Sequence, residues 1–394
     1  MNDLSVILLP LLLLAIGFII FCAITDKVMT KRQFKIIWGY IVILMFFMAL
    51  SFVPKDFIDW DLLRLYKHLN NIRVVGIEQA LKYTEYRNLY VVKYWMDFVA
   101  KTNNNNLFTA FPLFLDFTIY GYIFYDVFKK KGSMRIAFKD FLTATFLWIC
   151  LMGIKLAVSD VRCVFAMSIS CLAFYKEYIC SEKKIFSYAL YVVAIFTHHF
   201  AIVFLIYRVV LTIKRITGST KTLLIIFIFS QLIIYSGAQF LYEHSNIFYL
   251  REIARKLLAD WNIYGFTTYF FSREMSMKIL YLCFVTVFIA GYIWSNNKRK
   301  AFAISYSTTH VNEIRINDAL FVLSCIGIGF SFNYLLLERF LYISAYIFVL
   351  HYLLDSNREI YIGKVIRISP ILLYILYFND INIFIVNYIG HYIF

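Results

Sequence analysis

Short polar segments that join long apolar segments carry the side chains best suited to chemistry. An acidic residue stands beside an arginine at Asp160–Arg162 and at Glu338–Arg339, and two histidines are adjacent at His198–His199. A guanidinium forms paired hydrogen bonds to phosphate and keeps its charge at every physiological pH. An imidazole titrates near neutral pH and can accept a proton from a hydroxyl. The pattern therefore favours a site that binds a phosphorylated substrate and transfers a proton.

Each of these candidates also has an ordinary structural role. Arg162 could anchor to lipid headgroups, and Glu338–Arg339 could be a structural ion pair. His198–His199 could cap short helices, and Asp61 could cap the helix that it begins. Asp116, inside an apolar segment, could bond a neighbouring helix or serve a proton path. The remaining basic candidates, which could equally form a solvated face, are Arg251, Arg255 and Arg273.

Motifs for metal ions, nucleotides and covalent nucleophiles are missing from the sequence. The seven cysteines lie in or beside apolar segments without the spacing of metal ligands or of a disulfide framework. They are typical of small buried hydrophobic residues. We expect no metal and no cofactor.

Composition defines the broad class of protein. Of 394 residues, 62% are hydrophobic and only 16% are charged, whereas a soluble domain carries about 25% charged residues. The net charge of +15 comes from lysines and arginines in short loops between apolar segments, which is typical of membrane orientation signals and not of nucleic-acid binding. We predict an all-α, polytopic integral membrane protein whose residues 1–394 form one transmembrane domain.

About twelve transmembrane helices account for the apolar segments. A span needs roughly 17–25 largely apolar residues. Residues 185–213 and 318–354 are too long for one pass, and a polar turn at His198–His199 or Glu338–Arg339 divides each into two. The expected spans lie at 4–24, 36–53, 107–128, 141–157, 161–176, 185–213 (two), 222–242, 277–294, 318–354 (two) and 366–386.

Basic loops set the expected orientation. Loops 25–35, 129–140, 177–184, 214–221, 295–317 and 355–367 are rich in lysine and arginine, so the positive-inside rule places them in the cytoplasm. Both termini and the polar candidates then lie outside the cytoplasm. The extracytoplasmic loops 54–106 and 243–276 contain apolar residues at spacings of three and four, which predicts surface helices at 60–73 and 86–101 in the first.

The candidate segments resemble motifs of the EpsG/Wzy-type polysaccharide (O-antigen) repeat-unit polymerases between about residues 36 and 355. Because two histidines are adjacent, either could correspond to the histidine of the family motif. His199 fits better, since its distance to the small residue Ala201 matches the motif. The four segments that carry the resemblance are Asp61–Arg64–Tyr66 (DLLRLY), Asp160–Arg162–Ala166 (DVRCVFA), His199–Ala201 (HHFAIV) and Glu338–Arg339–Tyr342 (ERFLY).

The resemblance implies an inverting, metal-independent glycosyltransferase with a GT-C-like helical architecture in the bacterial inner membrane. Its substrates, donor and acceptor, would be oligosaccharide units on undecaprenyl diphosphate, and it would work with a flippase and a chain-length regulator. Arg162 and Arg339 would stabilise the departing diphosphate, and His199 or Asp61 would accept the proton. The expected substrate-binding residues are Arg64, Tyr66, Asp160, His198, Arg251, Arg255, Arg273, Glu338 and Tyr342.

Two other functions stay open. A lipid-linked oligosaccharide flippase or another transporter could also have twelve spans, although transporters usually show repeated halves and polar residues near the midplane. An O-antigen ligase-like transferase would use the same donor and differ in its acceptor.

Overall fold

The computed structural model is predominantly helical, as the sequence predicts. The chain divides into two units, the first made of residues 1–201 and 370–394 and the second of residues 202–369. The described residues are 28–52, 54, 60–130, 135–137, 141, 144–145, 148, 160–182, 184–217, 230–248, 250–252, 254–255, 258–259, 315–316, 318–319, 322, 343, 346–347, 349–350 and 353–354.

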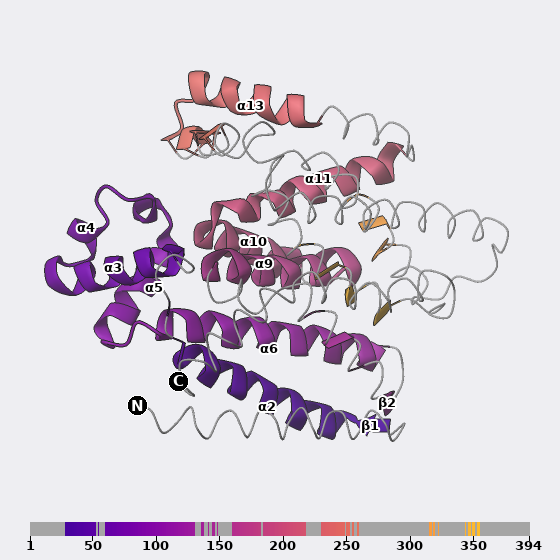
Figure 1. The fold of residues 1–394 in the computed structure, drawn as a ribbon. Helices are drawn as coiled ribbons and strands as arrows, with labels where there is room; N and C mark the ends of the chain where they lie inside the picture. Colours follow the sequence, from indigo (N-terminus) through magenta and orange to yellow (C-terminus); the bar gives the residue numbers. More distant parts are fainter. Residues whose placement is uncertain are drawn as a thin grey trace, which may run out of the picture. The chain divides into compact units, whose positions relative to one another are not determined.

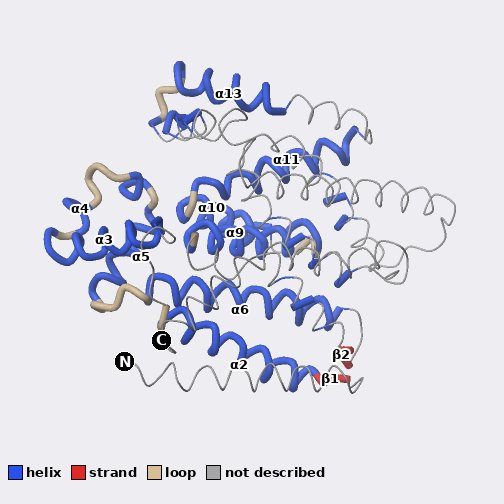
Figure 2. The backbone as a smooth tube through the Cα atoms, viewed as in Figure 1, coloured by secondary structure: helices blue, strands red, loops and turns tan. Residues whose placement is uncertain are grey.

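Helices form most of the described elements in both units (Figures 1 and 2). The described elements of the first unit are β1 (Val28–Thr30), α2 (Lys31–Leu50), α3 (Trp60–Val75), α4 (Ile77–Ala80), η1 (Glu85–Asn88), α5 (Tyr90–Lys101), α6 (Leu107–Lys130), β2 (Arg135–Ala137), α9 (Val161–Phe174), the π-helical turn η2 (Tyr175–Ile179), α10 (Lys184–Thr197) and η3 (His199–Ala201). Those of the second unit are α11 (Ile202–Thr217) and α13 (Ser230–His244).

Four helices of the first unit pack in the order α2, α6, α9 and α10, and Figure 1 shows them side by side. Helix α2 begins at Lys31, before its first apolar residue, because Thr30 and Gln33 form a capping box. The Thr30 hydroxyl accepts from the Gln33 amide, and the Gln33 side chain accepts from the Thr30 amide. This cap explains why α2 starts five residues earlier than the predicted apolar span.

Helices α2 and α6 run antiparallel, and a short strand pair closes one end of them. Strand β1, just before α2, pairs antiparallel with β2, which follows α6. The two predicted cytoplasmic loops 25–35 and 129–140 therefore meet at the same end. In the middle of the pair, the Trp38 indole donates to the Phe117 carbonyl at 2.7 Å. A side chain at Gly121 would collide with that indole, since a Cβ would lie 2.0 Å from its nitrogen.

Residues 60–106 fold into a helical cap at the other end of α6. Its apolar faces share one core with Phe108 of α6 and Val161 of α9. Arg73 ties the cap together by donating to the Ala100 carbonyl at 2.9 Å and to the Asn105 side chain at 2.7 Å. The cap residues of this core are Leu65, Leu69, Ile72, Leu81, Tyr86, Leu89, Val92, Met96, Val99 and Ala100.

The predicted helices correspond to observed ones where the structure describes them, but their ends differ. Within those residues, α2 and α6 are the two helices long and apolar enough to cross a membrane. The predicted surface helices correspond to α3 and α5, although residues 85–88 form a 3₁₀ turn instead of the start of α5. The predicted spans 4–24, 277–294 and 366–386 lie outside the described residues.

The long apolar segment 185–213 breaks at His198, as expected. Helix α10 ends at Thr197, and η3 occupies residues 199–201. The His198 ring accepts a hydrogen bond from the Phe200 amide at 3.2 Å through Nδ1. His198 thus caps the turn, which is the structural role that the sequence left open for it.

In the second unit, the described parts are α11, α13 and short helical stretches. The hydroxyl of Tyr207 on α11 donates to the carbonyl of Ala319. The described positions in 315–322 and 343–354 are helical, in agreement with spans predicted there.

Candidate functional site

A cluster of charged side chains lies where the cap meets the start of α9. Val161 is buried in the same core as Leu65 of α3 and Tyr86 of η1. Because this packing fixes the first turn of α9 against the cap, the neighbouring Arg162 faces carboxylates that are distant in the sequence. Arginine and acid candidates from two predicted motifs are thereby brought together.

Arg162 is the most buried charged residue of the cluster, with only 6% of its side chain exposed. Its Nη2 atom lies 3.5 Å from Asp61 Oδ2, and its Nη1 atom lies 3.4 Å from Glu85 Oε1. The guanidinium carbon lies 4.7 Å from the centre of the Tyr86 ring, a cation–π distance. Its Nε atom has no hydrogen-bond partner among the described residues. Arg162 thus keeps unused donor capacity.

Arg64 shares the same two carboxylates. Its Nη2 atom lies 2.6 Å from Asp61 Oδ1 and 3.9 Å from Glu85 Oε1. Asp61 stands in the first turn of α3, where the helix dipole favours a negative charge. Two arginines thus face two carboxylates, and three of the four cation–carboxylate distances are 3.4 Å or longer. An anion could therefore engage Arg162, whose two contacts are long, more readily than Arg64, which holds Asp61 at 2.6 Å.

His68 lies one helical turn beyond Arg64, on the same face of α3. Its ring packs edge-on against Tyr86, with ring centres 5.3 Å apart. Burial lowers the pKa of His68, and the positive charges of Arg64 and Arg162 lower it further. The imidazole is therefore held in its neutral form to lower pH than an exposed histidine.

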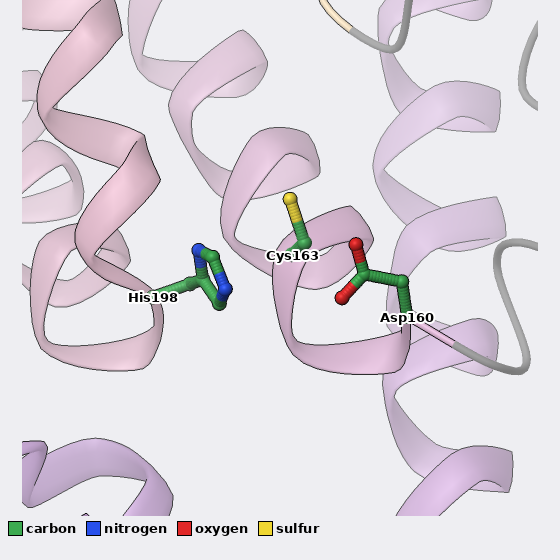
Figure 3. A group of neighbouring side chains, drawn as sticks. All are labelled: Asp160, Cys163 and His198. Carbon is green, nitrogen blue, oxygen red and sulfur yellow. The ribbon is translucent and has the colours of Figure 1, made fainter. Parts of the chain in front are cut away.

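Asp160, Cys163 and His198 form a second group beside the first turn of α9 (Figure 3). One possible ligand atom from each lies within 4.8 Å of the others, and a carboxylate, a thiolate and an imidazole are all zinc ligands. The Phe200 amide, however, uses the lone pair of His198 Nδ1. The neutral ring then carries its proton on Nε2, which makes that atom a donor and not a metal ligand. The arrangement fits hydrogen bonding to Asp160 better than metal coordination.

The other predicted residues occupy different positions. The Tyr66 hydroxyl donates to the Asn106 side chain at 2.9 Å, which ties α3 to the start of α6. His199 begins η3 and is half-buried. Asp116 is almost fully buried within α6.

Two of the basic candidates in the second unit, Arg251 and Arg255, are among the described residues. Arg255 forms two hydrogen bonds with Glu252, at 3.0 and 2.6 Å. Arg251 lies over the Tyr242 ring, with its guanidinium carbon 5.4 Å from the ring centre. Arg273, Glu338, Arg339 and Tyr342 lie outside the described residues.

Sequence reasoning missed three members of the charged cluster: Glu85, Tyr86 and His68. Glu85 lies between the two predicted surface helices, and Tyr86 was expected to begin the second of them, whereas both lie in a 3₁₀ turn. His68 did leave a signal, since it stands seven residues after Asp61 and four after Arg64, which places all three on one helical face.

Comparisons of this chain with protein-family models, with curated proteins and with solved structures find no match.

Proposed function

We propose that this chain is a polytopic membrane glycosyltransferase that joins oligosaccharide repeat units carried on undecaprenyl diphosphate, outside the cytoplasm of a bacterial cell. The observation that carries the proposal is the buried Arg162, which faces Tyr86, lies 3.4 and 3.5 Å from two carboxylates and leaves its Nε atom without a partner among the described residues. A buried, incompletely used guanidinium beside a second arginine suits a diphosphate.

The reaction follows from the leaving group. The acceptor hydroxyl attacks the anomeric carbon, the bond to the lipid diphosphate breaks, and the diphosphate departs with the bonding electrons. Arg162 and Arg64 stabilise the charge that develops on it, as preorganised donors do in other transfer reactions. Arg339 and Tyr342 keep the roles that the sequence resemblance implies for them, and His199 or Asp61 is the base expected from the sequence.

About twelve spans and extracytoplasmic termini belong to the proposal as well. The pairing of β1 with β2 supports a common side for the two basic loops, because it brings them to one end of α2 and α6. The charged cluster lies by the cap, at the end of α6 where that helix begins. A cytoplasmic strand pair and an extracytoplasmic site agree with the positive-inside rule.

A transporter, such as a lipid-linked oligosaccharide flippase, is the second candidate. Asp116 favours it, since this carboxyl is 1% exposed within a helix apolar enough to span a membrane, and such residues often mark ion paths. A ligase-like transferase would use the Arg162 cluster unchanged. The chain-length regulator, the flippase and the membrane lipid remain the expected partners.

The test replaces Arg162 in the cell that carries the gene and compares glycan length by gel electrophoresis. Arg162→Ala should reduce chain extension by roughly 10²–10³-fold while single lipid-linked units accumulate. Arg162→Lys should rescue poorly, because an ammonium cannot reproduce the guanidinium fork. Arg87→Ala is the matched control, since Arg87 is an exposed arginine of the 3₁₀ turn η1, which also carries Glu85 and Tyr86. Full-length polymer from Arg162→Ala at normal protein level contradicts the proposal, and loss of the lipid-linked units from the outer face favours the flippase.

A further inference from the structure

Three buried polar atoms around the ring of Tyr86 have no hydrogen-bond partner within the described parts of the chain. They are the Tyr86 hydroxyl, Nε of Arg162 and Nδ1 of His68. Tyr86 is 1% exposed and Arg162 is 6% exposed. Folded proteins leave few buried polar groups unpaired, and a polar ligand at this ring could pair with all three.

We propose that His68 is the general base of the site, the group that takes the proton from the acceptor saccharide hydroxyl. This inference rests on the proposed glycosyl transfer and assigns its proton acceptor. His68 packs against the same ring as Arg162, so a base and a diphosphate-binding group stand on two sides of Tyr86. The side chain is only half-buried, so part of the ring is open to an acceptor.

The surroundings of His68 keep its imidazole neutral. The charged groups around it are Arg64 and Asp61 on its own helix, Glu85 on η1 and Arg162 on α9. Burial lowers the pKa of His68 most, and Arg64 and Arg162 add to the effect. A base must be unprotonated before it can act, so this environment keeps His68 competent at mildly acidic pH.

His198 is less suited to the role. The Phe200 amide donates to its Nδ1 atom at 3.2 Å, so the neutral ring offers a proton on its other nitrogen instead of a lone pair. Nδ1 of His68 has no comparable donor among the residues that the structure describes. Of these two histidines, His68 is therefore the better proton acceptor.

The proposed step accounts for the proton and for the bonding electrons. The proton of the acceptor hydroxyl passes to a ring nitrogen of His68 as the oxygen forms its bond to the anomeric carbon. The bond from that carbon to the lipid diphosphate breaks, and the electron pair leaves with the diphosphate, next to Arg162. The imidazolium then returns its proton to water.

The first test uses membranes of the cell that carries the gene, which supply their own lipid-linked units. His68→Gln should slow chain extension by roughly 10²–10⁴-fold, because glutamine fills the space but accepts no proton at neutral pH. Binding of inorganic pyrophosphate to the purified full chain should stay within about threefold of wild type, since the guanidinium groups are intact. His244→Gln, on the exposed end of α13, is the control and should extend chains normally.

The second test follows the rate of extension against pH. The rate should fall on the acid side as His68 gains a proton, and Arg64→Gln should move that limb to higher pH, because losing the nearby positive charge raises the pKa of His68. A structural role for His68 would leave the limb where it is. An unmoved limb, or a His68→Gln rate within about threefold of wild type, overturns the assignment. Wild-type membranes that make no polymer would overturn the proposed function and this inference together. A wild type that makes polymer and a His68→Gln variant that does so equally well would overturn this inference alone.

Discussion

The first unit has a charged cluster near each end of α9, and the two differ in how completely their polar groups are used. The arginine cluster contains Asp61, Arg64, Glu85, Tyr86 and Arg162, and the lysine cluster contains Asp126, Lys130, Tyr175, Lys176 and Glu182. Arg162 and Lys176 stand 14 residues apart, which corresponds to about 21 Å along a helix.

The lysine cluster satisfies its members. The Tyr175 hydroxyl donates to Asp126 at 2.9 Å, and Lys130 lies 3.1 Å from Asp126 and 3.0 Å from Glu182. In the arginine cluster, by contrast, the tyrosine hydroxyl and Nε of Arg162 lack partners in the described parts of the chain. The difference indicates that one cluster ties helices together, whereas the other has capacity for a ligand.

The largest expected difference between the two ends is their side of the membrane. Asn71→Cys, exposed on α3, should react with an impermeant maleimide in intact spheroplasts. Lys129→Cys, exposed at the end of α6, should react only after the membrane is opened. The parent chain measures the background from native cysteines. Labelling of Lys129→Cys in intact spheroplasts would reverse the orientation and remove the site from the outer face.

A stability measurement tests whether the lysine cluster is structural. Asp126→Asn removes the carboxylate that faces Lys130, Lys176 and Tyr175, so it should lower the free energy of unfolding by about 1–3 kcal/mol. Asp97→Asn breaks an exposed pair with Lys101 and should cost about 0.5 kcal/mol or less. Thermal unfolding of the purified proteins measures both. Equal losses would mean that the buried position of Asp126 adds nothing.

The helices of the first unit could be predicted from the sequence because their apolar pattern is local. Helix α3 was predicted at 60–73 and extends from Trp60 to Val75, and the break at His198 follows from two polar rings in an apolar segment. The turn at Glu85–Asn88 was missed, because Tyr86 enters a core that is shared with Val161, 75 positions later in the sequence.

The candidate site was predictable only in its parts. Asp61, Arg64 and Arg162 were expected to act together because all three were placed on one side of the membrane. Their contact through Glu85 and Tyr86 depends on how the cap docks on α9, which no local pattern encodes. Arg339 and Tyr342 stay predictions, since they lie outside the described residues.

The smallest expected effect comes from Glu182 in the lysine cluster. The hydrogen bond from Lys130 lowers the pKa of Glu182 below its ordinary 4.5, and the charges of Lys130 and Lys176 act in the same direction. A carboxyl whose pKa is lower in the folded state stabilises the protein above its unfolded pKa, and that stability is lost as the pH falls through the folded pKa.

Glu182 is 43% exposed, so solvent screening limits the loss in Glu182→Gln at pH 7 to about 0.5 kcal/mol. The difference between wild type and variant should shrink as the pH falls through the lowered folded pKa of Glu182, because both side chains are then neutral. In a Lys130→Met background the same substitution should have a smaller effect, because the main cause of the shift is gone and the longer contact with Lys176 remains. Unfolding curves for the four proteins across this pH range test the prediction, and a difference that persists at low pH would show that Glu182 acts through packing and not through its charge.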